Sequence, residues 1–436
     1  MNICLLTPEF PPHTNWGGTA TFNYHLAHLL SSQGHKVVVL TLHPQRKSFH
    51  RHIVFHDTSS CLVIYCRPES QYSVLNICLK VIRTIMYRFV QNDLAFIFDW
   101  NVIAFFNYRN LLKHYPIDII HTQESLASYF LIKVFHKNTP VIVHSHSPQI
   151  LLNPYYKTTG ANRIRAWIER KVAVGQSSLV VPCSLTIADY WEKYFPRVTR
   201  YYIQNFISGK QQKTAKTDAE HANHPNLIFI GRLEYRKGVD ILLQAVMTLR
   251  KKYPSIKLHL IGLDNSSFLV NNKLTSFKEY SRLLYSRVQL QGVVFVGFFK
   301  TTEMVYQYIH RECPNPILIH PSRFEPFGYS IIECMARKIS VIVADSSGPG
   351  EIVTHGVTGI TLSPTPRAIC RAVSCLINHP HQRQRMIRNA YDAFKNQYSS
   401  QAVWSHYEMI YKSLRKITAR QNESPSTLNN NFEQMK

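Results

Sequence analysis

Acidic residues, long apolar runs and paired cysteines are all scarce in this 436-residue sequence, and each scarcity excludes a class of protein. No stretch of about 18 or more uninterrupted apolar residues occurs, so we expect no membrane-spanning helix. The nine cysteines are scattered and form no Cys-x-x-Cys pair. They give no sign of a zinc ribbon or a disulfide framework, and a reducing compartment is expected. The short apolar run at the N-terminus has no basic segment before it, so no signal peptide is expected.

The scarcity of acidic residues leaves a strong positive charge. Asp and Glu number 26 against 50 Lys and Arg, which gives a formal net charge of +24. Polyanions, acidic lipid headgroups and phosphorylated small molecules all suit such a chain. No RRM, KH or helix-turn-helix pattern is evident, so we expect no nucleic-acid partner. A basic nucleic-acid-binding protein is nevertheless the alternative from a different class. Hydrophobic residues reach 45%, enough for large cores, which excludes whole-chain disorder.

Short apolar runs alternate with helical patterns in two successive series. In the first series, a helix follows Gly17-Gly18 and strands are expected at 3–6, 36–42, 117–121, 141–144, 178–182 and 201–203. In the second, a helix is expected at 239–253 and strands at 227–230, 256–261, 293–296, 317–319, 340–344 and 359–362. Such alternation predicts an α/β fold with two doubly wound, Rossmann-like domains that face a central cleft.

The expected domain boundaries follow from changes in composition. Residues 208–224 are polar and form the predicted linker between an N-terminal domain at 1–207 and a C-terminal domain at 225–398. Residues 399–417 place an apolar residue at every third or fourth position, which predicts an amphipathic helix. The tail at 418–436 is rich in Asn, Ser and Gln and is expected to be disordered.

The most informative cluster follows the expected strand at 317–319. Glu325 stands in a loop with Pro326 and Gly328, and Glu333 lies about one turn inside the helix that begins near Tyr329. The free N–H groups of the first turn of such a helix favour an anion. The alternative is an ordinary strand-to-helix connection with two surface carboxylates.

A second cluster, residues 231–238, follows the expected strand at 227–230. Arg232 and Lys237 both reach a phosphate from this position, the guanidinium as a fork and the ammonium as a point charge. A basic surface turn is the alternative, because the chain is basic throughout.

Two features of the N-terminal half complete the candidate residues. Gly17 and Gly18 open a helix and allow a phosphate to approach the backbone closely, although they form neither a GxGxxG nor a Walker motif. His144 and His146 end one expected strand, and His121 ends the preceding one. A structural histidine is the alternative for each of them.

In their order along the chain, these clusters resemble the retaining, nucleotide-sugar-dependent glycosyltransferases of family 4, which have the GT-B fold. Residues 7–12 with Gly17-Gly18 look like the opening strand and donor-phosphate loop of that family. Residues 231–238 match its diphosphate clamp. Glu325 and Glu333, with seven residues between them, match its two-glutamate signature, and residues 349–359 look like the loop that follows. The resemblance extends from residue 1 to about residue 417.

The resemblance implies a role for each matching residue. Glu333 would bind the ribose hydroxyls of a nucleotide-sugar donor, and Glu325 would hold hydroxyls of the donor sugar. His146 would lie near the anomeric carbon. Further donor contacts are implied for Gly17, Gly18, Arg232, Lys237, Phe327, Gly328 and Tyr329.

The resemblance also implies the reaction, which is transfer of a sugar from a nucleotide-diphosphate sugar to a saccharide or lipid-linked acceptor with retention of anomeric configuration. The sequence has no Asp-x-Asp pair, so we expect no metal and no other cofactor. The family's last helix returns to the first domain, as expected here for 399–417. A GT-B sugar-nucleotide epimerase or a phosphorylase is the alternative within enzymes.

Residues 74–112 combine apolar and aromatic residues with interspersed Lys and Arg. A basic amphipathic helix of this kind can lie in an anionic membrane surface. The alternative is a helix that packs in the core with a solvated basic face. With the reducing compartment expected from the cysteines, we expect a cytoplasmic protein. If residues 74–112 form a membrane-surface helix, peripheral attachment to the inner face of the cytoplasmic membrane is expected as well.

Overall fold

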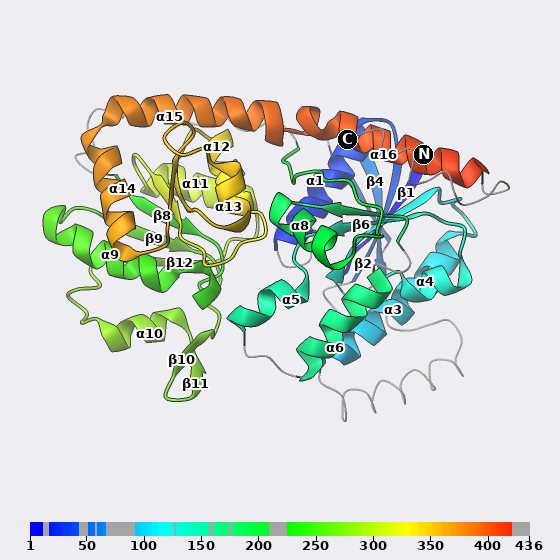
Figure 1. Cartoon of the computed structure of the whole chain (residues 1–436), viewed down its shortest axis with the longest axis horizontal. Helices are drawn as coiled ribbons and strands as arrows, with labels where there is room; N and C mark the ends of the chain where they lie inside the picture. The colour runs from blue at the N-terminus through cyan, green and yellow to red at the C-terminus, as the bar shows by residue number, and fades with distance from the viewer. Residues whose placement is uncertain are drawn as a thin grey trace. The chain divides into compact units, whose positions relative to one another are not determined.

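The computed structural model describes residues 1–11, 17–42, 51–56, 59–66, 92–125, 128–156, 160–173, 177–208 and 225–420 (Figure 1). The chain divides into two compact units. The first contains Met1–Gly209 and Val403–Lys436, and the second contains Lys210–Ala402.

The first unit is built on a seven-stranded sheet in the order β3-β4-β2-β1-β5-β6-β7. Its strands are β1 (Asn2–Leu6), β2 (Lys36–Leu42), β3 (Arg51–His56), β4 (Ser59–Cys66), β5 (Ile119–Gln123), β6 (Val141–Ser145) and β7 (Leu179–Pro182). All neighbours are parallel except β3 and β4. Its helices include α1 (Gly18–Ser32), α3 (Asn92–Leu111), α4 (Phe130–Phe135), α5 (Gln149–Leu152), α6 (Gly160–Ile168) and α8 (Leu185–Tyr194).

Strands β5, β6 and β7 are buried along their whole length, as strands covered on both faces must be. Two expectations from the sequence need correction here. Residues 201–203 are not a strand, since only Arg200 forms an isolated bridge to Val180. His121 and His144, expected as the last residues of their strands, lie inside β5 and β6, which continue to Gln123 and Ser145, and both are fully buried.

Helix α3 covers the second half of residues 74–112, for which the sequence left open either membrane contact or packing in the core. Trp100 and Tyr108 are fully buried in the core of the first unit. The Trp100 indole N–H donates a hydrogen bond to Ser128 Oγ over 2.6 Å. The core-packing alternative therefore holds for 92–111, while 74–91 lies outside the described residues. No helix in the described part of the chain is long and apolar enough to cross a membrane.

The second unit has a six-stranded parallel sheet in the order β12-β9-β8-β13-β14-β15. The strands are β8 (Leu227–Ile230), β9 (Leu258–Ile261), β12 (Val293–Gly297), β13 (Ile317–His320), β14 (Ser340–Ala344) and β15 (Ile360–Leu362). Its helices include α9 (Val239–Lys252), α10 (Phe277–Leu284), α11 (Thr302–Glu312), α12 (Tyr329–Ala336), α13 (Ser347–Ile352), α14 (Pro366–Asn378) and α15 (Pro380–Ala393). The chain order reverses between β8 and β13, the switch point where doubly wound sheets bind ligands.

A short hairpin, β10 (Phe268–Val270) with β11 (Lys273–Thr275), interrupts this alternation and was not expected from the sequence. Asn271 and Asn272 join its strands with φ angles of 48° and 59°. Two consecutive positive φ angles match the type I′ turn that suits the twist of a two-residue hairpin.

The last helix, α16 (Ser400–Arg420), packs against the first unit from Val403 onward. Its Tyr411 hydroxyl lies 2.7 Å from His121 Nδ1, and the rings of Tyr407 and Phe206 are in contact. The helix continues through residues 418–420, which we had expected to belong to the disordered tail.

Candidate active site

The two C-terminal sequence clusters meet at the switch point of the second sheet. Residues 231–238 follow β8, and residues 321–328 follow β13, its neighbour in the sheet. Gly238 allows the two segments to touch, because a Cβ there would lie 2.1 Å from the Pro321 carbonyl oxygen. Its φ of 69° also belongs to the left-handed region that glycine adopts most easily.

A chain of alternating charges runs through this contact. The Lys237 ammonium pairs with Glu325 Oε2, and Arg236 Nη1 lies 3.6 Å from the same oxygen. Arg236 Nη2 also donates to Glu234 Oε1 over 2.8 Å, and Arg232 Nη2 lies 3.4 Å from that oxygen. Four of these side chains are mostly buried, whereas the Arg232 side chain is 51% exposed.

These neighbours fix the charge of Glu325. Burial alone would raise the pKa of its carboxyl, but the nearby cations Lys237 and Arg236 outweigh burial and lower that pKa to about 2. Glu325 is therefore an anion at neutral pH, and it fixes the position of the Lys237 ammonium at the strand end.

A third loop supports Glu325 from its backbone. Ser347, the first residue of α13, accepts a hydrogen bond from the Glu325 amide over 3.1 Å, and the Gly348 amide donates to the Glu325 carbonyl over 3.0 Å. A Cβ on Gly348 would lie only 2.4 Å from the Pro326 carbonyl oxygen. Residues after β8, β13 and β14 therefore converge on Glu325, the first at its carboxylate and the last at its backbone.

The start of α12 lies just beyond Glu325, where the sequence placed it. Gly328 caps the helix with a φ of 113°, and Tyr329 is its first residue. Phe327 is buried and its ring contacts Tyr398. The first amides of a helix have no acceptor within it, so this end carries partial positive charge.

Glu333 lies on the buried side of α12. Its Oε2 accepts a hydrogen bond from the Tyr306 hydroxyl over 3.1 Å. Burial raises the pKa of Glu333, and the Arg337 guanidinium opposes that increase. The two glutamates thus differ in surroundings, since cations hold Glu325 as an anion whereas burial favours the neutral form of Glu333.

In the first unit, Gly17 is the exposed N-cap of α1 and Gly18 is the helix's first residue. Residues 12–16 of the same loop lie outside the described residues. His146 follows β6 directly and is buried, and burial lowers the pKa of its imidazole to about 3, so the ring is neutral. Its ring packs 4.7 Å from that of Phe22 in α1.

The backbone at His146 is held by a carboxylate that sequence reasoning missed. Glu124 follows β5, and its Oε1 accepts hydrogen bonds from the amides of His146 and Ser147 over 2.9 and 2.5 Å. Glu169, just after α6, accepts the Gln149 amide over 2.9 Å. The only signal in the sequence was that Glu124 directly follows a buried strand.

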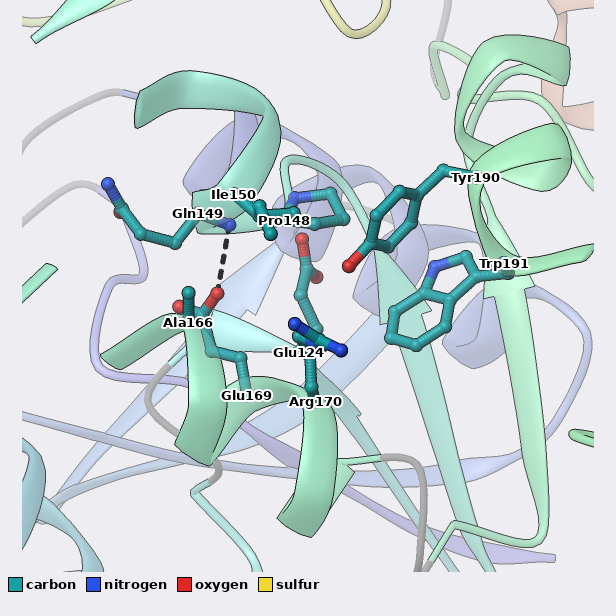
Figure 2. A pocket seen from close by; sticks show the side chains of 9 residues that line it. All are labelled: Glu124, Pro148, Gln149, Ile150, Ala166, Glu169, Arg170, Tyr190 and Trp191. Carbon is teal, nitrogen blue, oxygen red and sulfur yellow. Dashed lines mark hydrogen bonds between the residues drawn. The ribbon is translucent and has the colours of Figure 1, made fainter. Parts of the chain in front are cut away.

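Figure 2 shows the small pocket in which these two carboxylates lie, with the Glu124 side chain pointing toward Pro148 and Tyr190. Burial raises the pKa of Glu124 to about 7, the amide of Ser147 opposes the increase, and the Glu169 carboxylate adds to it. The pocket therefore contains a titratable carboxyl group, that of Glu124, which is hydrogen-bonded to the backbone of the segment that carries His146.

Two family models match this chain. Residues 16–208 match Glycosyltransferase Family 4, and residues 210–393 match Glycosyl transferases group 1, so the two matches adjoin and leave only the chain ends uncovered. The chain therefore belongs to the glycosyltransferases that combine these two domains, as the resemblance predicted.

Individual relatives are distant. Glycogen synthase of Mycobacterium tuberculosis is 21% identical over 429 residues, with 95% of each chain covered. Alpha-D-kanosaminyltransferase of Streptomyces kanamyceticus is 24% identical over 291 residues, covering 63% of this chain and 71% of the relative.

Solved structures show the same fold along nearly the whole chain. Sucrose-phosphate synthase from Thermosynechococcus elongatus has a TM-score of 0.70 at 17% identity and covers 95% of this chain and 98% of its own. The catalytic domain of Starch Synthase IV from Arabidopsis thaliana, bound to ADP and acarbose, has a TM-score of 0.65 at 14% identity, with 95% and 99% covered. The predicted GT-B fold is confirmed, and the protein is a glycosyltransferase of this type.

Proposed function

We propose that the protein transfers a sugar from a nucleotide-diphosphate sugar to a saccharide or lipid-linked acceptor, with retention of the anomeric configuration. One observation supports this proposal most: Lys237 and Glu325 pair at the switch point of the second sheet, beside the N-terminus of α12. That position offers fixed positive charge where a diphosphate would leave and a fixed negative charge where a sugar would bind.

The donor contacts follow from this arrangement. Arg232 is half exposed and would turn from Glu234 toward a diphosphate, whereas Lys237 is held in place by Glu325. The amides of Phe327, Gly328 and Tyr329 would contact phosphate or sugar oxygens. Gly17 and Gly18 are kept as proposed donor-phosphate contacts.

The two glutamates would hold different parts of the donor. Glu325, an anion between two cations, would accept hydrogen bonds from hydroxyls of the donor sugar. Glu333 would accept a ribose hydroxyl at the carboxylate that already binds Tyr306.

The reaction itself breaks the bond between the anomeric carbon and the diphosphate oxygen. Positive charge grows on the sugar and negative charge grows on the phosphate. Lys237 and the start of α12 stabilise the negative charge, and Glu325 favours the positive one. In the leading route, the acceptor hydroxyl attacks from the face that the phosphate leaves, and a phosphate oxygen takes its proton. No metal ion is included in this route. The neutral His146 ring would contribute a hydrogen bond near the anomeric carbon rather than a charge.

The acceptor and location are proposed from charge. A net charge of +24 suits an acceptor on an anionic surface, and residues 74–91 are the part of 74–112 that remains a candidate for membrane contact on the cytoplasmic side.

The test begins with thermal unfolding of the purified protein in a panel of uridine, guanosine and adenosine diphosphate sugars. A bound donor raises the midpoint by mass action. The stabilising donor is then incubated with saccharide and lipid-linked acceptors, and the anomeric configuration of the product is read by NMR. An inverted product contradicts retention. A donor that changes without any acceptor indicates an epimerase, and stabilisation by nucleic acid alone would support the basic-protein alternative.

A further inference from the structure

Tyr306 of α11 connects a neighbouring helix to Glu333, the glutamate that is proposed to hold the donor ribose. Its hydroxyl donates a hydrogen bond to Glu333 Oε2 over 3.1 Å, and the two residues are only 6% and 7% exposed. Burial raises the pKa of the Tyr306 phenol well above its usual range, so the hydroxyl keeps its proton at neutral pH. The tyrosine is therefore a fixed hydrogen-bond donor to one oxygen of this carboxylate.

Arg337, at the C-terminal end of α12, holds both partners of this hydrogen bond. Its Cζ lies 3.8 Å from the centroid of the Tyr306 ring, in a cation–π contact, and its Nη1 donates to the backbone carbonyl of Glu333 over 3.2 Å. One guanidinium thus fixes the tyrosine ring and the backbone of the glutamate, so the hydroxyl and the carboxylate meet in one orientation.

This arrangement determines which oxygen of Glu333 can bind a ligand. Oε2 accepts the Tyr306 hydroxyl, whereas Oε1 accepts no hydrogen bond from the described residues. A glutamate without such a bond has several rotamers to lose when it binds a ligand, and ordering a side chain costs free energy. A hydrogen bond to the ionised carboxylate also lowers the pKa of Glu333, against the burial that raises it.

We propose that Tyr306 is a positioning residue for donor binding: its hydroxyl orients the Glu333 carboxylate and leaves Oε1 to accept a ribose hydroxyl of the nucleotide sugar. This inference rests on the proposed function, in which Glu333 binds the ribose. Tyr306 acts through Glu333 and needs no contact with the donor. Because the ribose does not react, the effect belongs to donor affinity and not to the chemical step.

The test compares Tyr306→Phe with wild type, using the nucleoside diphosphate sugar that stabilises the protein in the thermal panel. The substitution keeps the ring and its contact with Arg337 and removes only the hydroxyl. We expect the donor KM to rise roughly three- to tenfold while kcat stays within about twofold of wild type. Isothermal titration with the same sugar, without acceptor, should show the same loss of affinity.

The pH dependence of the donor KM gives a second measurement. The groups that act on the Glu333 carboxyl are Tyr306 from α11 and Arg337 and Cys334 from α12, and burial raises the pKa of the Cys334 thiol to about 12, so it is neutral. Without the hydroxyl, the pKa of Glu333 should rise further, and the neutral acid is the weaker acceptor. The ratio of the variant's KM to that of wild type should therefore be larger at about pH 6 than at about pH 8.

Tyr308→Phe is the matched control. Tyr308 lies on the same helix, and its hydroxyl is 2.9 Å from His259 Nδ1, so its loss also breaks one hydrogen bond of α11 but none to Glu333. We expect this variant to keep the donor KM of wild type at both pH values. The thermal midpoints of the two variants show whether α11 is destabilised equally in both.

The double substitution Tyr306→Phe with Glu333→Gln tests whether the tyrosine acts through the glutamate. If it does, the donor KM of the double variant should match that of Glu333→Gln alone to within about twofold. Effects that multiply would mean that Tyr306 acts independently, and would overturn the proposal.

The remaining outcomes separate this inference from the proposed function. A wild-type KM for Tyr306→Phe beside a raised KM for Glu333→Gln, or an equal rise in Tyr308→Phe, would overturn the positioning role and leave the ribose contact intact. A wild-type KM for Glu333→Gln would contradict the ribose contact itself, and the positioning role would fall with it.

Discussion

The side chains of Lys237 and Glu325 fix each other's charge and position. The ammonium keeps the carboxylate ionised in a buried position, and the carboxylate prevents the ammonium from moving with solvent. Neither charge would be tolerated at this depth by itself, since removing one partner of a buried pair leaves an uncompensated charge. The pair therefore presents one fixed positive and one fixed negative charge to a charged or polar ligand.

Substitution of either basic donor residue should lower turnover. Arg232→Ala and Lys237→Ala each remove positive charge where phosphate charge grows, at a cost on the order of 2–4 kcal/mol in the barrier. We expect the larger effect for Lys237, because its position is fixed, whereas Arg232 is half exposed. The measurement is kcat at saturating donor, with the exposed Lys251→Ala as control. Turnover equal to wild type in both variants would remove them from the diphosphate site.

Glu325→Gln and Glu333→Gln should fail in different ways. Glu333 is proposed to hold the unreactive ribose, so its loss weakens ground state and transition state alike and raises the donor KM. Glu325 lies beside the proposed breaking bond, so its loss lowers kcat. Donor-saturation kinetics measured side by side separate the two roles. A wild-type kcat for Glu325→Gln together with a reduced kcat for Glu333→Gln would reverse the assignment.

Glu124 gives a prediction about pH. Its pKa rises from 4.5 in the unfolded chain to about 7, so the folded protein binds more protons between these values and loses stability as pH rises through this window. The side chain of Glu124→Gln cannot ionise. The unfolding free energy of this variant, taken relative to that of wild type, should therefore rise by roughly 2–4 kcal/mol as the pH increases from 5 to 8.

Activity should move in the opposite direction. Gln keeps one acceptor oxygen but places an amide nitrogen, which cannot accept a hydrogen bond, where Glu124 Oε2 accepts the His146 N–H over 3.0 Å. The His146 segment should therefore shift, and kcat should fall even where the variant is more stable. Denaturant titrations and kcat measured across this pH range test both parts. A variant with wild-type kcat throughout would give Glu124 no positioning role.

At the scale of elements, strands that form continuous apolar runs could be predicted from the sequence, whereas short irregular elements could not. Strands β8 and β14 have the predicted bounds because each is a buried apolar run between turn residues. The β10–β11 hairpin was missed because three-residue strands give too short a pattern, and its Asn-Asn turn is weaker evidence than Asn-Gly.

The candidate site was predicted residue by residue but not as a set of contacts. Sequence spacing marked Lys237 and Glu325 separately, yet their pairing depends on β8 and β13 being neighbours across the switch point. Apart from the position of Glu124 after a buried strand, Glu124 and Glu169 belong to no local pattern. They act on backbone amides of another segment, and only the fold brings those amides within reach.

Gly238 tests the contact between the loops after β8 and β13. Gly238→Ala places a methyl group against the Pro321 carbonyl oxygen and also requires a left-handed alanine. Gly356 is the matched control, because its φ of 72° is equally left-handed while nothing lies within 4 Å of its added Cβ. We expect Gly356→Ala to cost about 1 kcal/mol and Gly238→Ala at least about 2 kcal/mol more. If chemical denaturation gave the same loss of unfolding free energy for Gly238→Ala and Gly356→Ala, the loops after β8 and β13 would accommodate the methyl group without strain.

At the scale of the whole molecule, α16 joins the end of the chain to its beginning. Tyr411 and His121 are 290 residues apart in sequence, yet their side chains are hydrogen-bonded in the core of the first unit. Tyr407, one turn earlier, is equally buried, but its hydroxyl has no hydrogen-bond partner among the described residues. The same deletion of one oxygen should therefore have different effects at the two positions.

Tyr411→Phe leaves the buried His121 Nδ1 without its partner, and should cost about 1–3 kcal/mol of unfolding free energy. Tyr407→Phe removes a hydroxyl that is buried without a partner, so it should be neutral or slightly stabilising. Scanning calorimetry is the measurement, because each unit has its own core and can give its own transition. Since α16 belongs to the first unit from Val403 onward, only the transition of that unit should move. A loss confined to the second unit's transition, or an equal loss in both variants, would contradict the assignment of this helix and of its hydrogen bond.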